Sequence, residues 1–163
     1  MIQEYKDLLL KDLCTRLPYG VKVKVNSEYL SEELIKVGYD KSLVVYGITA
    51  DGSISFTLDK GLMEYSMPIL SIKPYLFPLS SMTEEQKKEY YSLADDVTIK
   101  PGQGSCLGIK IHCIKLGISD NPHEEVWDYI DLAALDWLNK NHFDYRGLIE
   151  KGLAIDATGL NIY

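Results

Sequence analysis

The sequence predicts an α+β protein in which an N-terminal helix and C-terminal helices pack with a small, curled antiparallel sheet of SH3-like size. Two observations predict this fold class. Apolar residues recur with helical spacing over residues 2–17 and again after residue 83, and they alternate as in strands between these segments. The chain has 163 residues, 46% of them hydrophobic, which is enough for one core. We therefore expect one domain over residues 1–163, β-rich over about residues 18–78 and mainly helical, with one extra strand, over about residues 83–163.

The first predicted element is an amphipathic helix over residues 2–17. Pro18 and Gly20 follow it and end it, because proline lacks the N–H of a helical residue and glycine favours a turn. The apolar residues of this segment lie three or four positions apart, so that they form one stripe, which consists of Ile2, Tyr5, Leu9, Leu13 and Leu17.

Short strands are predicted in the next part of the chain. The segment VKVKV alternates strictly between valine and lysine, which is typical of a strand with one buried face. Asp51-Gly52 separates two of the strands and predicts a hairpin with a type I′ turn. Ser31 leaves an alternative open, because it could cap a short helix instead of leading into a strand. The predicted strands are residues 21–25, 34–39, 42–48, 53–57 and 69–76.

The second half of the chain is predicted to be mainly helical. Thr83 and Gln86 have the spacing of a capping box, which predicts a helix over residues 84–94. A loop at 100–108 and a strand at 107–116 follow. Asn121-Pro122-His123-Glu124 is a second helix start, and this helix runs to about Lys140. Its expected buried stripe is Val126, Ile130, Ala133 and Trp137, with Ala134 beside them.

The segment HFDYRGLIEKGLA, residues 142–154, places His142, Asp144 and Arg146 at alternate positions. Alternate residues do not line one helix face, so the spacing does not indicate a catalytic array. Arg146 could bind an anion beside the free N–H groups of a helix start. The segment otherwise fits a short helix. Asp144 would be its N-cap, Phe143 and Leu148 would form a hydrophobic staple, and Gly152 would be the C′ glycine.

Charge and cysteine content exclude several classes of protein. The net charge is −7, and Arg16 and Arg146 are the only arginines, whereas nucleic-acid binders usually present a basic face. Anionic membranes are disfavoured for the same reason. The first residues do not resemble a signal peptide, and no apolar run approaches the roughly 20 residues that span a bilayer. Three irregularly spaced cysteines suggest reduced thiols, so we expect a cytoplasmic protein without contact to nucleic acid or membrane.

Motifs for metals and phosphates are weak. The segment PGQGSCLG has glycines that could approach a phosphate, but it lacks the GK[ST] of a P-loop and is more typical of a plain loop. Its polar residues Lys100, Gln103 and Ser105 could still contact a ligand. A zinc site lacks the usual ligand spacing, so we predict no metal and no cofactor. The four residues that such a site would need are Cys106, His112, Cys113 and His123.

Tyrosine is the one compositional excess, with twelve tyrosines against three phenylalanines. Its ordinary explanation is packing at the rims of the sheet and helices, and the alternative is a binding surface. Tyr75 lies close to Lys73 in the chain, and Tyr145 precedes Arg146. An aromatic ring beside a cation binds nucleotide-like ligands by stacking and charge. These pairs are therefore candidate ligand contacts.

Three segments resemble an uncharacterised family of hypothetical proteins from gut Bacteroidales, their phages and mobile elements. They are LCTRLPYGVKVKV, KPYLFPLSSMTEEQKKEY and DWLNKNHFDYRGLIEKGLAIDA. Residues 26–66 and 95–120 match this family less well. The resemblance implies a cytosolic accessory protein, in the host cytoplasm if it is phage-encoded, but it carries over no catalytic residue. Small phage proteins of this kind often block host enzymes or sequester signalling nucleotides.

These observations favour a non-enzymatic binding protein of phage or mobile-element type that sequesters a small nucleotide-like signalling ligand as counter-defence. One alternative is a protein-interaction module that inhibits a host protein, and another is an enzyme whose site is assembled from distant segments. A homo-oligomer is left open. No residue is assigned a catalytic role, and the candidate ligand-binding residues are Arg146, Tyr145, His142, Lys73, Tyr75, Lys100, Gln103 and Ser105.

Overall fold

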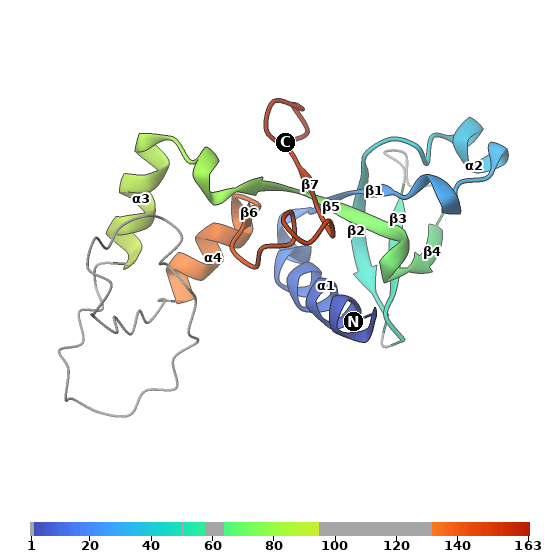
Figure 1. Ribbon diagram of the computed structural model, residues 1–163, viewed down its shortest axis with the longest axis horizontal. Helices are drawn as coiled ribbons and strands as arrows, with labels where there is room; N and C mark the ends of the chain where they lie inside the picture. The colour runs from blue at the N-terminus through green and yellow to red at the C-terminus, as the bar shows by residue number, and fades with distance from the viewer. Residues whose placement is uncertain (1, 50, 58–63, 95–131) are drawn as a thin grey trace.

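The computed structural model describes residues 2–49, 51–57, 64–94 and 132–163. Figure 1 shows α1 beside the sheet, and α3 and α4 gathered at the far end of the long strand β5. The helices are α1 (Ile2–Arg16), α2 (Glu32–Val37), α3 (Glu84–Ala94) and α4 (Leu132–Lys140). The strands are β1 (Lys22–Val25), β2 (Leu43–Ile48), β3 (Ser53–Thr57), β4 (Glu64–Pro68), β5 (Ile72–Pro78), β6 (Phe143–Asp144) and β7 (Ile155–Asp156).

The sheet is open and mixed. Its order is β4-β3-β2-β1-β5-β6, and β7 also pairs with β5. Neighbours from β4 to β5 are antiparallel, whereas β6 and β7 both run parallel to β5. The predicted α+β class and N-terminal helix are therefore confirmed, but closure into an SH3-like barrel is not shown. Two strands from the end of the chain extend the sheet instead.

The predicted strand at residues 34–39 is wrong, and the alternative helix is confirmed. Ser31 caps α2 by accepting a hydrogen bond from the N–H of Leu34 at 3.3 Å. Gly38 ends the helix with φ of 104°, a left-handed conformation that glycine adopts without strain. The fourth strand is β4, which the sequence pattern does not predict. It is defined by its register with β3, from Ser53 opposite Pro68 to Thr57 opposite Glu64.

The hairpin between β2 and β3 is present, but its turn is not of type I′. The N–H of Gly52 donates to the carbonyl of Thr49 at 2.9 Å. Type I′ needs positive φ at both central residues, and among the described turn residues only Gly52 has one, at 81°. The Asp51 carboxylate accepts the N–H of Ser53 at 3.1 Å and so supports this different turn.

The short helix predicted after Asp144 is also wrong. Phe143 and Asp144 form β6, and turns follow it over residues 148–152. The expected staple does not form, because Phe143 packs in one apolar cluster and Leu148 in another. Gly152 does have positive φ, at 69°, although it ends a turn and not a helix.

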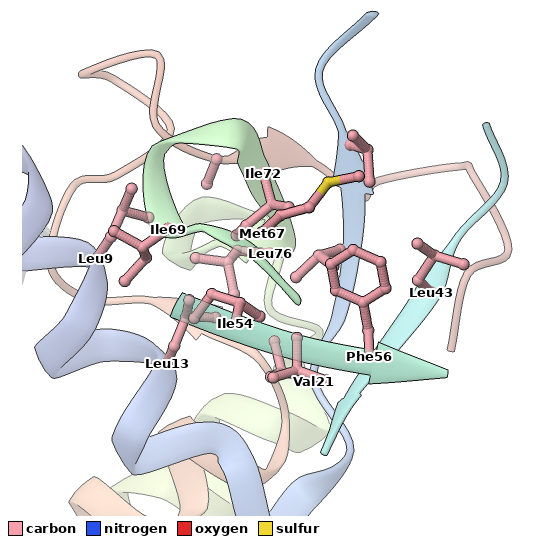
Figure 2. Packing of buried hydrophobic residues seen from close by; sticks show 14 of the residues in the cluster. Leu9, Leu13, Val21, Leu43, Ile54, Phe56, Met67, Ile69, Ile72 and Leu76 are labelled. Carbon is pink, nitrogen blue, oxygen red and sulfur yellow. The ribbon is translucent and has the colours of Figure 1, made fainter. Parts of the chain in front are cut away.

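Two apolar clusters form the interior. The larger one lies between α1 and the sheet, as Figure 2 shows for Leu9, Leu13 and Phe56. Ile2 does not belong to it, since 74% of its surface is exposed. The smaller cluster joins α3, α4 and β6 around Trp137 and Phe143, whose rings stack with centroids 5.6 Å apart. β5 reaches both clusters.

The buried face of α4 agrees with the predicted stripe only in part. Trp137 and Ala134 are buried, whereas Ala133 is exposed. The Thr83–Gln86 capping box is confirmed, because each residue's side chain accepts the other's backbone N–H, at 3.2 and 2.9 Å. The loop at 100–108, the strand at 107–116 and the helix start at 121–124 lie outside the described residues.

Candidate functional site

A pocket of about 370 Å³ lies where β5, α3, the end of α4, β6 and the last residues of the chain meet. We call it the C-terminal pocket. It combines aromatic walls with amide and hydroxyl groups and one lysine. The residues used below are Phe77, Gln86, Lys140, His142, Thr158 and Tyr163.

His142 is the most unusual residue of this pocket. Its backbone has φ of 57°, a left-handed conformation that few residues other than glycine adopt. Two backbone bonds hold it there: its N–H donates to the carbonyl of Asn139 at 3.1 Å, and its carbonyl accepts from Phe77 at 2.9 Å. The side chain is buried, and within the described residues its Nδ1 atom has no hydrogen-bond partner. Such a conformation, held against its intrinsic preference, is common at functional sites.

The imidazole of His142 is neutral at physiological pH. Burial lowers its pKa from 6.5 to about 4, and the positive charges of Arg16 and Lys22 act in the same direction. A neutral imidazole offers one donor and one acceptor nitrogen. The Nδ1 atom is buried, and it has no hydrogen-bond partner among the described residues.

The ring of Tyr163 forms a fixed wall beside His142. The two rings stack with centroids 3.9 Å apart and an angle of 14° between their planes. The Tyr163 hydroxyl donates to the carbonyl of Tyr75 at 2.9 Å and accepts the N–H of Lys22 at 3.0 Å. Burial raises the pKa of this hydroxyl to about 12. Tyr163 is therefore a neutral platform and not a proton donor to the pocket.

A buried ion pair on α1 contacts residues 138–143, the segment that carries Lys140 and His142. Asp12 and Arg16 are both fully buried, and the guanidinium binds the carboxylate through Nε at 2.8 Å and Nη2 at 3.0 Å. Arg16 also donates to the carbonyls of Phe143 at 2.7 Å and Leu138 at 3.5 Å. Arg16 thus holds both ends of residues 138–143 against α1. We call the ion pair, together with the carbonyls of Leu138 and Phe143, the Asp12–Arg16 clamp.

Asn139 extends this network. Its side-chain oxygen accepts hydrogen bonds from the hydroxyls of Tyr145 at 2.8 Å and Thr15 at 3.2 Å. Arg146 in turn donates from Nη2 to the Tyr145 hydroxyl at 3.0 Å, and its guanidinium carbon lies 4.8 Å from the Tyr145 ring centroid. Tyr145 is therefore a support for Arg146.

The structure brings some of the predicted ligand-binding residues together and separates others. His142, Tyr145 and Arg146 lie around the clamp, but of these only His142 lines the C-terminal pocket. Lys73 lies on β5 opposite Lys24 of β1. Tyr75 is 7% exposed, and burial raises its pKa. Lys100, Gln103 and Ser105 lie outside the described residues, as do the cysteines and histidines weighed as zinc ligands.

Several pocket residues were not singled out in the sequence. Lys140 and Thr158 carry no motif, and Gln86 was predicted only as part of the capping box and not as a site residue. Tyr163 was one tyrosine among twelve. Only the excess of tyrosine was a usable signal, and it did not indicate which ring forms a wall.

Neither a family model, nor a curated protein, nor a solved structure matches this chain. In the part of the chain that the structure describes, no three histidine, cysteine, aspartate or glutamate residues are grouped so that they could hold a metal ion. The described helices also include none with the length and apolar character needed to cross a membrane.

Proposed function

We propose that this protein is a non-enzymatic binding protein whose C-terminal pocket holds a small, flat, nucleotide-like ligand. The observation that carries the proposal is that His142, whose buried Nδ1 atom has no partner among the described residues, lines a pocket that also contains Lys140. A buried polar atom without a partner is costly, so such atoms are rare in folded proteins. A ligand that bonds to Nδ1 removes this cost.

The walls of the pocket support a flat ligand. Phe77 and Tyr163 lie with ring centroids 6.0 Å apart, and Tyr163 also stacks on His142. Aromatic side chains bind planar bases by stacking, at about 1–3 kcal/mol per base. The amide nitrogen of Gln86, whose oxygen accepts the N–H of Thr83, and the hydroxyl of Thr158 add polar groups that suit the edge of a heterocycle.

The size and charge of the pocket limit the ligand further. A volume of about 370 Å³ lies near the lower end of the usual range for ligand sites, which is roughly 300–1,000 Å³. Because His142 is neutral, Lys140 supplies the only full positive charge among the described lining residues. These features favour a nucleoside or nucleoside monophosphate over a dinucleotide with several phosphates.

The same residues favour binding over catalysis. The described lining contains no carboxylate and no thiol, and the Tyr163 hydroxyl is occupied by two backbone bonds. In nucleophilic catalysis that pairs a hydroxyl or thiol with a histidine, the two groups lie within hydrogen-bond reach, and His142 Nδ1 has no such partner among the described residues. Sequestration of a host signalling nucleotide during phage infection is the biological setting that the family resemblance implies, and it rests on that resemblance alone.

Calorimetric titration with a panel of nucleosides, nucleoside monophosphates and cyclic nucleotides tests the proposal. We expect at least one monophosphate to bind and the Lys140→Gln variant to bind it about tenfold more weakly, because a charge-assisted contact to phosphate is lost. Lys36→Gln is the matched control, since Lys36 is also an exposed lysine in the last turn of a helix. No binding by any member of the panel, or equal weakening by both variants, would contradict the proposal.

A further inference from the structure

We propose that Arg146 forms a second binding site, for a small oxyanion, that is independent of the C-terminal pocket. The carboxylate of the Asp12–Arg16 clamp is shared. Two guanidinium groups, those of Arg16 and Arg146, share one carboxylate, Asp12. Arg146 shares that carboxylate and is 25% exposed, so its remaining N–H groups gain from an added anion.

Asp12 cannot neutralise both arginines. Both of its oxygens already accept short bonds from Arg16, at 2.8 and 3.0 Å, and the carboxylate is fully buried. The Nε atom of Arg146 lies 3.4 Å from Asp12 Oδ1, but it makes no hydrogen bond there or to any other residue that the structure describes. Among the described residues no other acid pairs with Arg146.

The guanidinium of Arg146 is held ready for a ligand. It stacks on Tyr145 and donates from Nη2 to the Tyr145 hydroxyl, and this hydroxyl is fixed by Asn139. The Arg146 side chain is 25% exposed, so its free edge reaches solvent. Its Nη1 atom donates no hydrogen bond within the described residues. A fixed guanidinium loses little conformational entropy when it binds.

Lys151 and Glu150 both lie near Arg146, because Lys151 Nζ and Glu150 Oε2 are 3.1 and 3.8 Å from the point that a Cβ on Gly147 would occupy. The Nζ atom of Lys151 donates to the carbonyls of Arg146 at 3.4 Å and Gly147 at 3.2 Å. The ligand chemistry that this arrangement recognises is an oxyanion with two adjacent oxygens, as in a phosphate or a carboxylate. The net charge of −7 opposes binding, so the affinity for a free anion should be weak, roughly millimolar.

The presence of only two arginines makes a direct experiment possible. The Nε–Hε signals of Arg16 and Arg146 can be followed by nuclear magnetic resonance during titration with inorganic phosphate and, separately, with acetate, at constant pH and ionic strength. We expect the Arg146 signal, identified by its loss in Arg146→Gln, to shift and saturate. The Arg16 signal should stay in place, because that side chain is fully buried and bonded.

Three comparisons decide the inference. A saturating shift with phosphate alone identifies a phosphate site, and a similar shift with acetate identifies a general carboxylate or phosphate site. The Lys140→Gln variant should titrate as the unchanged protein does, whatever the fate of the nucleotide proposal. A static Arg146 signal, shifts of both arginines that rise without saturation, or loss of the Arg146 response in Lys140→Gln would overturn the inference.

Discussion

His142 has a direct consequence for stability at acid pH. Its pKa is about 4 in the folded protein and near 6.5 in the unfolded chain, so the unfolded chain binds more protons between these values. The contribution of His142 to the free energy of unfolding is therefore complete above pH 6.5 and is lost as the pH drops from 6.5 to 4. We expect a loss of up to about 3 kcal/mol from this group, measured by urea unfolding at a series of pH values.

The control for this prediction is His142→Asn. Asparagine tolerates positive φ and does not titrate, so the variant should unfold with a much flatter pH dependence over the same window. The charges that face His142 are Arg16 and Lys22, which keep their charge throughout it. An unchanged pH dependence in His142→Asn would assign the effect to other groups.

Asp144 is the second residue whose role is measurable. Its two oxygens accept the N–H groups of Leu148 at 2.9 Å and Ile149 at 2.8 Å, and its side chain is buried. Asp144→Ala should lower the free energy of unfolding by about 2–3 kcal/mol, because two donors to a charged acceptor lose their partner. Asp144→Asn, which keeps one acceptor oxygen, should lose about half as much in urea denaturation. Equal stability of all three proteins would contradict this assignment.

The local sequence predicted the role of some individual residues. An aspartate shortly before Gly147 and Leu148 suggested an acceptor of backbone N–H groups, and Asp144 is one, although no helix follows it. Arg16 could not be predicted in the same way. Its carbonyl acceptors, Leu138 and Phe143, are 122 and 127 positions away in the chain. No local pattern identifies partners at such a separation.

At the scale of elements, the Asp12–Arg16 clamp joins α1 to α4 and β6. Asp12→Asn should lower the free energy of unfolding by about 3–5 kcal/mol, because it leaves the fully buried Arg16 without a counter-charge. Asp7→Asn is the matched control, since Asp7 is an exposed acid on the same helix, and its effect should stay within about 0.5 kcal/mol. Chemical denaturation measures both, and similar effects for the two variants would show that the clamp adds little.

Elements whose signals are local were predicted well. The helix over residues 84–94 was predicted from a capping box whose two bonds are both present. The segment LIKVGY has the composition of a strand, but Ser31 and Gly38, which flank residues 32–37, favour a helix, and these end signals were stronger. β4 has no such signal, because EYSMP is a strand only through its pairing with β3.

On the scale of the whole molecule, the two apolar clusters should unfold together. β5 packs in both of them, and the clamp ties α1, in the larger cluster, to α4 and β6, in the smaller one. In a Trp127→Phe background Trp137 is the only tryptophan, and it reports on the smaller cluster.

Leu13→Ala tests this coupling from the opposite cluster. It should destabilise the protein by about 2–5 kcal/mol, because Leu13 is fully buried. The midpoint of unfolding by Trp137 fluorescence should shift as much as the midpoint by circular dichroism. A fluorescence midpoint that does not move would show that the clusters unfold separately.

The sheet order and the pocket could not be predicted from local sequence patterns, because both depend on residues far apart in the chain. The α+β class follows from the change of periodicity along the chain, but β6 and β7 are two-residue strands that exist only because β5 is available for parallel pairing. The C-terminal pocket is assembled from segments that range from Phe77 to Tyr163. Residues such as Lys140 and Thr158 gain a role only when that assembly brings them together.

The central claim is that the C-terminal pocket binds a nucleotide-like ligand. Its most direct test is a map of amide chemical-shift changes when the nucleotide that binds most tightly in calorimetry is added. We predict that the largest changes fall on Lys140, His142, Thr158 and Tyr163, and that the amides of α2, far from the pocket, do not move (Figure 1). Saturating changes that cluster on α2, or on any surface other than the pocket, would contradict the account.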